Sequence, residues 1–208
     1  MTKRTLETEN YKFLGKLPQE TIDFFKDEIL KRKEPNNPYQ WIKFDYFLNE
    51  EFLKIFKNTE LEIQQYKGMP VQKVFYSDPG HGFRIHKDGI NCRSALNIAL
   101  SCNEGDWVRW YDEELINKLT QTTVQYGKKT GSSRNTDIFN YEKIPYIDEL
   151  KNEVGDVYVL NVEKYHSFKC IGKQPRLILQ TKFEGFPVFE VIKDSLSEKS
   201  FENLIKFH

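Results

Sequence analysis

Two residues with metal-binding side chains stand close together in a short stretch of the chain. His86 and Asp88 lie two positions apart in the sequence RIHKDG, which we predict to be part of a β-strand. Because side chains alternate between the two faces of a strand, both would project to the same face and could hold one metal ion. Imidazole nitrogen and carboxylate oxygen suit a ferrous ion, and a second histidine would complete a two-histidine, one-carboxylate site with open coordination positions. Alone, such a pair is more often a surface pair beside a turn.

The third ligand would have to come from a strand that the fold brings alongside. The chain has four histidines, at positions 81, 86, 166 and 208. His166 opens the strand-like sequence HSFKC and is the leading candidate, whereas His81 lies in the turn-like sequence DPGHG and is not expected to be a ligand. Four histidines are also few for a cupin-like metalloenzyme with other chemistry.

An arginine follows ten residues after His166. Arg176 opens the otherwise apolar sequence RLILQTKF, and a buried guanidinium needs a partner because an unpaired buried charge is very costly. Its planar fork matches a carboxylate, which could belong to a cosubstrate such as 2-oxoglutarate or to an Asp or Glu of the chain. If residues 171–175 form a five-residue hairpin loop, Arg176 lies opposite Cys170 and on the sheet face of His166. A four-residue loop would point Arg176 away.

Taken jointly, the spacing of His86, Asp88, His166 and Arg176 resembles that of the double-stranded β-helix (jelly-roll) 2-oxoglutarate oxygenases. The segments HKDGINCRSALNIAL and GDVYVLNVEKYHSFKCIGKQPRLILQTKF are most similar to the aspartyl/asparaginyl β-hydroxylase branch. That branch has an NCR triplet after the first histidine, a glycine eleven residues before the second, and an arginine ten residues after the second. Residues 91–93, Gly155 and Arg176 match these positions. The resemblance covers roughly residues 71–185.

The resemblance implies a hydroxylase with iron(II), 2-oxoglutarate and dioxygen as its cofactor and cosubstrates. His86, Asp88 and His166 would hold iron, and Arg176 would anchor 2-oxoglutarate, whose decarboxylation to succinate drives oxidation of a C–H bond. Some members of the branch have glycine at the position of Asp88, so the carboxylate implies the full three-ligand site and argues against a halogenase. The branch has a basic residue at the position of Asn97. We interpret Asn97 as a cosubstrate contact, with a core amide as an equal alternative.

Four further residues are candidates for a substrate pocket. Arg84 shares strand parity with His86, although a surface arginine is equally consistent. Arg93 belongs to the NCR triplet, and an ion pair near a turn is its alternative. Trp107 and Trp110 could line a substrate groove, but such aromatic residues more often fill a sandwich core.

Short apolar stretches separated by turn sequences predict a mainly β core. The expected strands cover residues 71–76, 83–88, 93–101, 107–111, 156–162, 166–171 and 176–183. Their spacing favours an antiparallel sandwich or barrel, and the resemblance specifies a jelly roll.

We expect one domain over residues 1–208, divided into three parts. Residues 1–68 would be helical N-terminal support, with helices at 18–33 and 49–58. The jelly-roll core would span 69–190, and a helical tail would span 191–208. Apolar residues at helical spacing mark the first helix: Ile22, Phe25, Ile29 and Leu30.

A polar segment, residues 112–149, interrupts the predicted core. It begins with the helix-like sequence DEELINKL and continues with glycine, serine and charged residues. Because loops of this length are uncommon inside a compact domain unless they serve a site, we interpret the segment as a lid or a substrate-docking loop.

Composition narrows the function classes. The chain has 31 basic and 31 acidic residues and a formal net charge of zero, which argues against nucleic acid as the partner. No apolar run approaches the roughly 18 residues of a membrane span, and the N-terminus has no signal sequence. Three cysteines are too few for a disulfide framework, so we expect a reducing, cytoplasmic location.

The substrate is the least determined feature of the sequence. We expect hydroxylation of an Asp, Asn or other polypeptide side chain, with a small molecule as the close alternative. A non-catalytic jelly-roll binding module is the alternative from another class. The oligomeric state is not predicted.

Overall fold

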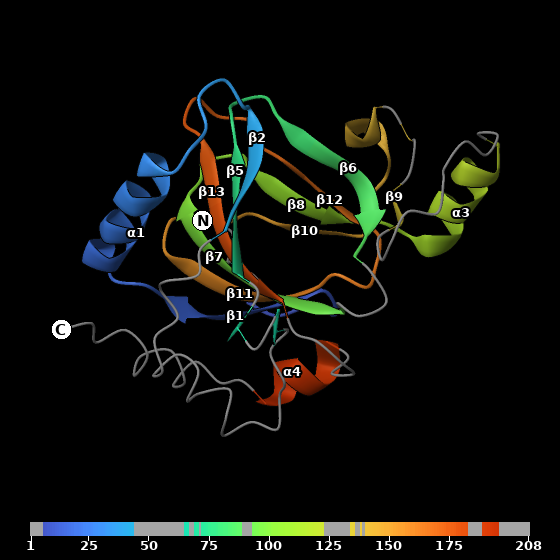
Figure 1. Ribbon diagram of the computed structural model, residues 1–208. Helices are drawn as coiled ribbons and strands as arrows, with labels where there is room; N and C mark the ends of the chain where they lie inside the picture. The colour runs from blue at the N-terminus through green and yellow to red at the C-terminus, as the bar shows by residue number, and fades with distance from the viewer. Residues whose placement is uncertain are drawn as a thin grey trace.

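Two antiparallel sheets packed face to face form the core of the computed structural model (Figure 1). The structure describes residues 6–43, 65–66, 69–70, 72–88, 93–122, 134–135, 138, 140–182 and 189–195. The large sheet has the strand order β1 (Tyr11–Lys16), β11 (Asp156–Asn161), β7 (Ser94–Ser101), β13 (Arg176–Lys182), β5 (Gln72–Ser77) and β2 (Tyr39–Lys43). The small sheet has the order β10 (Asp148–Leu150), β8 (Trp107–Trp110), β12 (His166–Lys169), β6 (Gly82–Lys87) and β9 (Arg134–Asn135). A separate ribbon pairs β3 (Gln65–Tyr66) with β4 (Met69–Pro70).

All seven predicted strands are present, with ends within two residues of the expected ones. The prediction of a mainly β fold is therefore confirmed. The expectation of helical support in residues 1–68 was incomplete, because β1 and β2 from that region are the two edge strands of the large sheet. The predicted helix at 49–58 lies outside the described residues.

The large sheet is buried on both faces. Every residue of β7 is buried, and its side chains alternate between two apolar environments. Leu96, Ile98 and Leu100 face outward, where they share a core with α1 (Gln19–Lys31). Ala95 faces inward and packs with residues of the small sheet. Near-continuous apolar strands are the expected result of burial on both faces.

Helix α1 matches the first predicted helix. Ile22, Phe25 and Ile29 are buried against the large sheet, whereas Leu30 is 46% exposed and lies outside this apolar face, contrary to expectation. Helix α4 (Phe189–Ser195) adds Phe189 to the same core. The rest of the predicted C-terminal tail lies outside the described residues.

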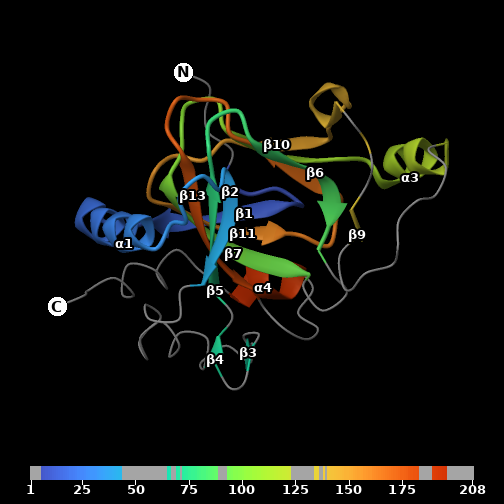
Figure 2. The ribbon, with the colours of Figure 1, turned by 45° about the horizontal axis from the view of Figure 1, so that its top comes forward.

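Helix α3 (Glu113–Thr122) covers the outer face of the small sheet, on the opposite side of the molecule from α1 (Figures 1 and 2). Ile116 of α3 packs with Ile85, Tyr111 and Tyr165. The helix-like sequence at the start of the 112–149 segment is therefore a helix, capped at its N-terminus by Asp112, whose Oδ1 accepts a hydrogen bond from the Leu115 amide at 2.8 Å. Within the described residues, no helix has the length and apolar character needed to cross a membrane.

The space between the sheets has two different ends. One end is apolar and is filled by Tyr11, Ala95, Val108, Trp110, Leu150, Tyr158, Leu160 and Val162. The other end contains the histidines and the arginine that the sequence singles out.

Candidate metal centre

Two neighbouring strands of the small sheet bring the three predicted ligands together. His86 of β6 is the direct cross-strand partner of His166 of β12, and residues directly opposite on one sheet face are in side-chain contact. The two imidazole rings have centroids 4.2 Å apart, and Nε2 of His86 lies 3.7 Å from Oδ1 of Asp88. The three side chains offer ligand atoms that all lie within 4.8 Å of one another, in the one such cluster found among the described residues.

Backbone contacts determine the tautomer of both histidines. Nδ1 of His86 lies 2.9 Å from the carbonyl oxygen of Arg84, and Nδ1 of His166 lies 2.9 Å from that of Lys164. A carbonyl oxygen only accepts hydrogen bonds, so Nδ1 carries the proton in each ring and Nε2 carries the lone pair that a metal ion requires. Histidine ligands in metal sites are oriented in this way by a second contact. The donor set fits a ferrous ion.

A β-bulge decides which residues share the face of His86. His166 pairs with His86, and Phe168 pairs with Phe83, so two steps along β12 correspond to three along β6. Phe83 therefore lies on the metal side, with its ring edge-on to His86 at 4.6 Å between centroids. The side chain of Arg84 is exposed. The bulge interrupts the alternation on which the Arg84 prediction was based, and a place for Arg84 in a substrate pocket stays a prediction.

Arg176 reaches the site by a route that differs from the predicted hairpin. Strand β12 belongs to the small sheet and β13 to the large sheet, so residues 170–175 cross between sheets and the loop-length argument does not apply. Arg176 is 3% exposed, and its guanidinium carbon lies 4.7 Å from the centre of the Phe168 ring. Phe168 stands two residues after His166 in β12. Arg176 therefore points between the sheets, toward the strand that carries His166.

The crossing segment before Arg176 is held by the turn between β7 and β8. Asp106 is 1% exposed, and its Oδ1 accepts a hydrogen bond from the Ile171 amide at 2.7 Å. Asn103 forms two hydrogen bonds with the backbone of Gln174, at 2.7 and 2.9 Å. A Cβ atom at Gly172 would collide with the side chain of Asn103, so glycine permits this close approach. These contacts fix the start of β13 and the position of Arg176.

The polar surroundings of Arg176 also affect a neighbouring thiol. Burial is the largest cause that raises the pKa of the Cys170 thiol to about 11; the carboxylate of Asp106 acts in the same direction, and the positive charge of Arg176 opposes both. Cys170 is fully buried and is therefore a small core residue beside the crossing segment.

Asn97 lies on the inward face of β7, opposite Gln180 of β13. Its Oδ1 accepts a hydrogen bond from Nε2 of Gln180 at 3.0 Å, and both side chains are buried. This contact is what the core-amide alternative expects. The predicted contact between Asn97 and a cosubstrate stays a prediction.

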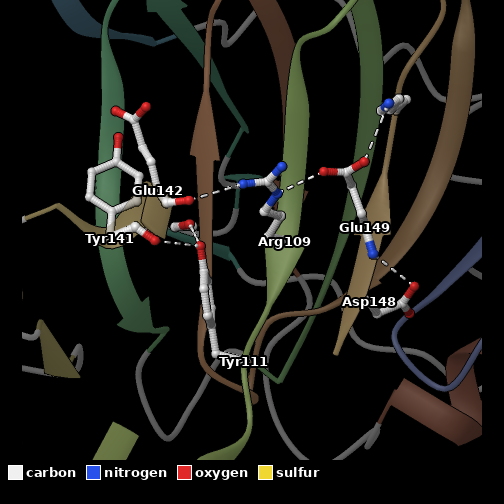
Figure 3. A network of polar contacts seen from close by, with 8 residues as sticks. Arg109, Tyr111, Tyr141, Glu142, Asp148 and Glu149 are labelled. Carbon is white, nitrogen blue, oxygen red and sulfur yellow. Dashed lines mark hydrogen bonds and ion pairs between the residues drawn. The ribbon is translucent and has the colours of Figure 1, made fainter. Parts of the chain in front are cut away.

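Both tryptophans pack in the protein interior. Trp107 is 4% exposed on the outer face of the small sheet, where its ring lies 4.2 Å from the guanidinium carbon of Arg109. Arg109 in turn pairs with Glu149 at 2.7 Å, within the polar network of Figure 3. Trp110 faces inward but is fully buried at the apolar end, and its Nε1 donates to the carbonyl of Asn161 at 2.8 Å. Both positions are those expected of core aromatic residues, and the substrate-groove interpretation stays a prediction.

The position of Arg93 also favours its structural alternative. Its Nε lies 3.4 Å from Oε1 of Glu163, and its carbonyl accepts hydrogen bonds from the amides of Val162 and Glu163. Arg93 thus forms an ion pair that joins the start of β7 to the turn before β12.

The 112–149 segment flanks the sheet that carries the candidate ligands in two ways. Its strand β9 pairs with β6, with Asn135 directly opposite His86. Helix α3 and residues Ile138, Tyr141 and Ile144 pack on the outer face of the small sheet. On the same face, the hydroxyl of Tyr111, which is labelled in Figure 3, lies 2.7 Å from Oγ of Ser167, the residue that follows His166. The described parts thus support the site from its edge and from behind. Most of residues 123–139 lie outside the description, and the lid interpretation stays a prediction.

Sequence reasoning missed two aromatic residues and one hydroxyl at the site. Phe168 could have been found, because it stands two residues after His166 and so shares its strand face. Phe83 could not, because the bulge in β6 has no evident sequence signal. Ser77, the cross-strand partner of Arg176, became apparent only from the register of β5 and β13.

No protein-family model and no curated protein matches the sequence. Several solved structures resemble this fold. HygX from Streptomyces hygroscopicus, with nickel and 2-oxoglutarate bound, has a TM-score of 0.57 at 10% identity, and the match covers 84% of this chain and 82% of the HygX chain. The viral collagen prolyl hydroxylase vCPH from Paramecium bursaria Chlorella virus-1, in complex with 2-oxoglutarate, has a TM-score of 0.52 at 15% identity. This match covers 88% of this chain and 100% of the vCPH chain. A prolyl-4-hydroxylase from Pseudomonas putida has a TM-score of 0.51 at 13% identity, and the match covers 86% of this chain and 95% of the hydroxylase chain.

Identities this low show the fold alone. The two facing antiparallel sheets and these three likenesses together confirm the predicted double-stranded β-helix. The finer resemblance to the aspartyl/asparaginyl β-hydroxylase branch stays a prediction.

Proposed function

We propose that this protein is an iron(II)- and 2-oxoglutarate-dependent oxygenase that hydroxylates a C–H bond. One observation carries the proposal: two histidines with protonated Nδ1 atoms and one carboxylate converge within 4.8 Å. They do so on a sheet face toward which a buried arginine projects from the opposite sheet. A structural ion-pair cluster would need neither the matched tautomers nor the arginine. The structures of HygX and vCPH with bound 2-oxoglutarate support the same proposal through the shared fold.

Each residue of the site has a distinct role in this proposal. His86, Asp88 and His166 would hold iron, and Arg176 would bind the distal carboxylate of 2-oxoglutarate through its guanidinium fork. Iron with 2-oxoglutarate and dioxygen supplies oxidation of a C–H bond, with succinate and carbon dioxide as co-products. The chain itself orients the ligands through the Arg84 and Lys164 carbonyls and covers one face of the guanidinium with Phe168.

Anaerobic spectroscopy tests the assignment without knowledge of the substrate. Iron(II) and 2-oxoglutarate added to the protein should give a weak visible charge-transfer band, and admission of air should release succinate. His166→Ala should abolish the band, and Arg176→Ala should keep it only at higher 2-oxoglutarate concentration.

Two matched variants control for the loss of a histidine or an arginine as such. His81→Ala removes an exposed histidine from a turn, and Arg84→Ala removes an exposed arginine beside the site. Both should retain the band. If wild-type protein gave neither band nor succinate, the oxygenase proposal would fail and a non-catalytic binding module would be favoured.

The substrate remains part of the proposal. The resemblance of residues 71–185 to the aspartyl/asparaginyl β-hydroxylase branch favours an Asp or Asn side chain of a polypeptide, and a small molecule is the second candidate. Succinate release measured over a panel of Asp- and Asn-containing peptides and free metabolites separates the two. Stimulation by metabolites alone would reject the polypeptide.

A further inference from the structure

A cation–π contact lies on the reverse side of the two histidine ligands. His86 and His166 are the last directly opposite residues of the ladder between β6 and β12, as far as the structure describes these strands. Lys87 follows the first histidine and Tyr165 precedes the second, so they are the next residues along this antiparallel pair. Because side chains alternate, both point to the outer face of the small sheet. The ammonium nitrogen of Lys87 lies 4.6 Å from the centre of the Tyr165 ring.

Helix α3 binds both members of this pair. Nζ of Lys87 donates a hydrogen bond to Oε1 of Glu113, in the first turn of the helix, at 2.6 Å. The Tyr165 hydroxyl donates to Oδ1 of Asn117 at 3.3 Å. Glu113 and Asn117 are four positions apart and therefore lie on one face of α3. One helix face thus contacts the ends of both strands that carry the candidate ligands.

The Tyr165 ring is the stronger partner of the lysine. The side chain of Lys87 is 15% exposed, and Tyr165 belongs to an apolar cluster with Ile85 and Ile116. A cation over an aromatic ring is held more strongly when it is shielded from water. An ion pair with an exposed carboxylate, such as that of Glu113, contributes little by itself.

The candidate ligands stand where such a contact is needed. His86 is the penultimate residue of β6, Asp88 follows that strand, and His166 is the first residue of β12. Strand ends open more easily than strand centres. A backbone hydrogen bond from the Asp88 amide to the carbonyl of Val162, at 3.0 Å, joins the two segments at this end. The contact between the lysine and the tyrosine is a further connection there, made by side chains.

We propose that Lys87 is a positioning residue of the metal centre. Its contact with Tyr165 holds the ends of β6 and β12 in the relative position that binds a metal ion, and its contact with Glu113 couples α3 to metal binding. This inference rests on the proposed function, because it concerns the metal site of that proposal. Since coupling is reciprocal, a metal ion that fixes the ligand strands also restrains α3.

The sign of the effect distinguishes positioning from simple electrostatics. Lys87→Met keeps an unbranched side chain and removes the charge. Loss of a positive charge near a cation site by itself tightens metal binding, whereas loss of the positioning contact should raise the Kd for nickel(II) about fivefold. Lys87→Arg keeps a cation over the ring and should restore the wild-type Kd. Calorimetric titration of the metal-free protein with nickel(II) measures these values.

Two matched controls separate this contact from the loss of an ion pair or of a hydroxyl. Lys169, on the same outer face, pairs with Glu142 at 2.7 Å and has a side chain that is 20% exposed. Lys169→Met therefore removes a comparable ion pair and should not raise the Kd. Tyr165→Phe keeps the ring and should bind nickel(II) like wild type. Tyr165→Leu removes the ring without a change of charge and should weaken binding as Lys87→Met does.

Hydrogen exchange tests the coupling to α3 without reference to affinity. With nickel(II) at a saturating concentration, the amides of residues 113–122 should exchange more slowly than in metal-free protein, both in wild type and in Lys87→Arg. In Lys87→Met nickel(II) should leave their exchange unchanged. Helix α1, on the opposite side of the molecule (Figure 1), is the internal control and should not respond to nickel(II) in any of these proteins.

Each contrary outcome has a definite meaning. An unchanged or lower Kd in Lys87→Met, or an equal rise in Lys169→Met, would overturn the inference while the proposed function stood. Equal slowing of α3 exchange in Lys87→Met and wild type would overturn the coupling to the helix. Wild-type protein that neither bound nickel(II) nor gave the band with iron(II) and 2-oxoglutarate would instead reject the proposed function, and this inference with it.

Discussion

The two ends of the space between the sheets are built from neighbouring residues with opposite properties. Trp110 and His166 are direct cross-strand partners in β8 and β12, yet Trp110 belongs to the apolar cluster and His166 to the metal centre. At the apolar end the side chains fill the interior. At the other end Ser77 Oγ and Gln180 Oε1 are buried without partners among the described residues. Unpaired buried side-chain atoms also occur elsewhere in the described part of the chain, at Asn10, Asn152 and Asn161. The feature that distinguishes the polar end is therefore the convergence of two histidines and a carboxylate.

The largest expected effect is a difference in the free energy of unfolding between two variants of neighbouring residues, Trp110 at the apolar end and His166 at the polar end. Trp110→Ala should lower the free energy of unfolding by about 3–5 kcal/mol, because it leaves a large cavity in a closed core. His166→Ala should change the stability of the metal-free protein by about 1 kcal/mol at most, since its main loss is one hydrogen bond to a backbone carbonyl. Urea denaturation of both variants measures the difference. Equal losses would mean that His166 is a structural residue, and that the two ends of the space between the sheets do not differ in this way.

Metal ions should bring the stability losses of the two variants closer together, because only His166→Ala removes a candidate metal ligand. With metal at one hundred times its Kd, binding to the folded state should stabilise wild-type protein by about 2.7 kcal/mol. Trp110→Ala should gain the same increment if it still folds, and His166→Ala should gain almost none. Thermal unfolding with iron(II), or with nickel(II) as an air-stable substitute, gives the increments. His81→Ala serves as the control and should respond like wild type.

The sequence was sufficient to predict that His86, Asp88 and His166 lie together, but not the geometry around them. Alternation along a strand correctly grouped His86 with Asp88, because the bulge lies before His86 and not after it. The same rule does not extend to Arg84, two residues earlier, because the bulge depends on pairing with β12 and has no reliable local signature. Register with a distant strand is a property of the folded sheet.

The path of the chain into β13 shows a similar limit. The sequence GKQP between His166 and Arg176 has the composition of a hairpin turn, but Asp106 and Asn103 from a distant turn hold this segment across the gap between the sheets. A local turn signal cannot distinguish a hairpin from a crossing. The inward position of Arg176 was nevertheless anticipated, because a guanidinium in an apolar strand must find a partner.

The strands of the N-terminal region were overlooked for another reason. Strand β1 has a glycine and a register shift between Phe13 and Gly15, which blur the period-two pattern. Strand β2 follows closely on a stretch rich in proline and asparagine. Edge strands carry a weak sequence signal, because only part of their surface is buried.

Variants of Asn97 distinguish a cosubstrate contact from a core amide at the polar end. Asn97→Ala leaves Nε2 of Gln180 without its acceptor and should destabilise the metal-free protein by about 1–3 kcal/mol. If Asn97 also contacts the cosubstrate, the Kd for 2-oxoglutarate should rise as well. Asn97→Ala with Gln180→Leu removes both amides, so recovered stability with persistently weak 2-oxoglutarate binding would identify a cosubstrate contact. Recovery of both would identify a core amide.

The smallest effect concerns the thiol beside the arginine and leaves folding at neutral pH unchanged. Burial raises the pKa of Cys170 to about 11, so the thiol is neutral in the folded protein at pH 8. An unfolded chain loses this proton near the usual pKa of about 8.5. The contribution of Cys170 to stability is therefore fully present below that pH and is lost as pH rises toward 11. The NMR chemical shift of the Cys170 Cβ carbon, which follows ionisation of the thiol without a reagent, should titrate near pH 11 in folded protein and near pH 9 in denaturant. Since the charge of Arg176 lowers this pKa, Arg176→Ala should move the folded midpoint to higher pH, whereas Arg84→Ala should not. An unchanged midpoint in Arg176→Ala would mean that the charge of Arg176 does not act on the thiol.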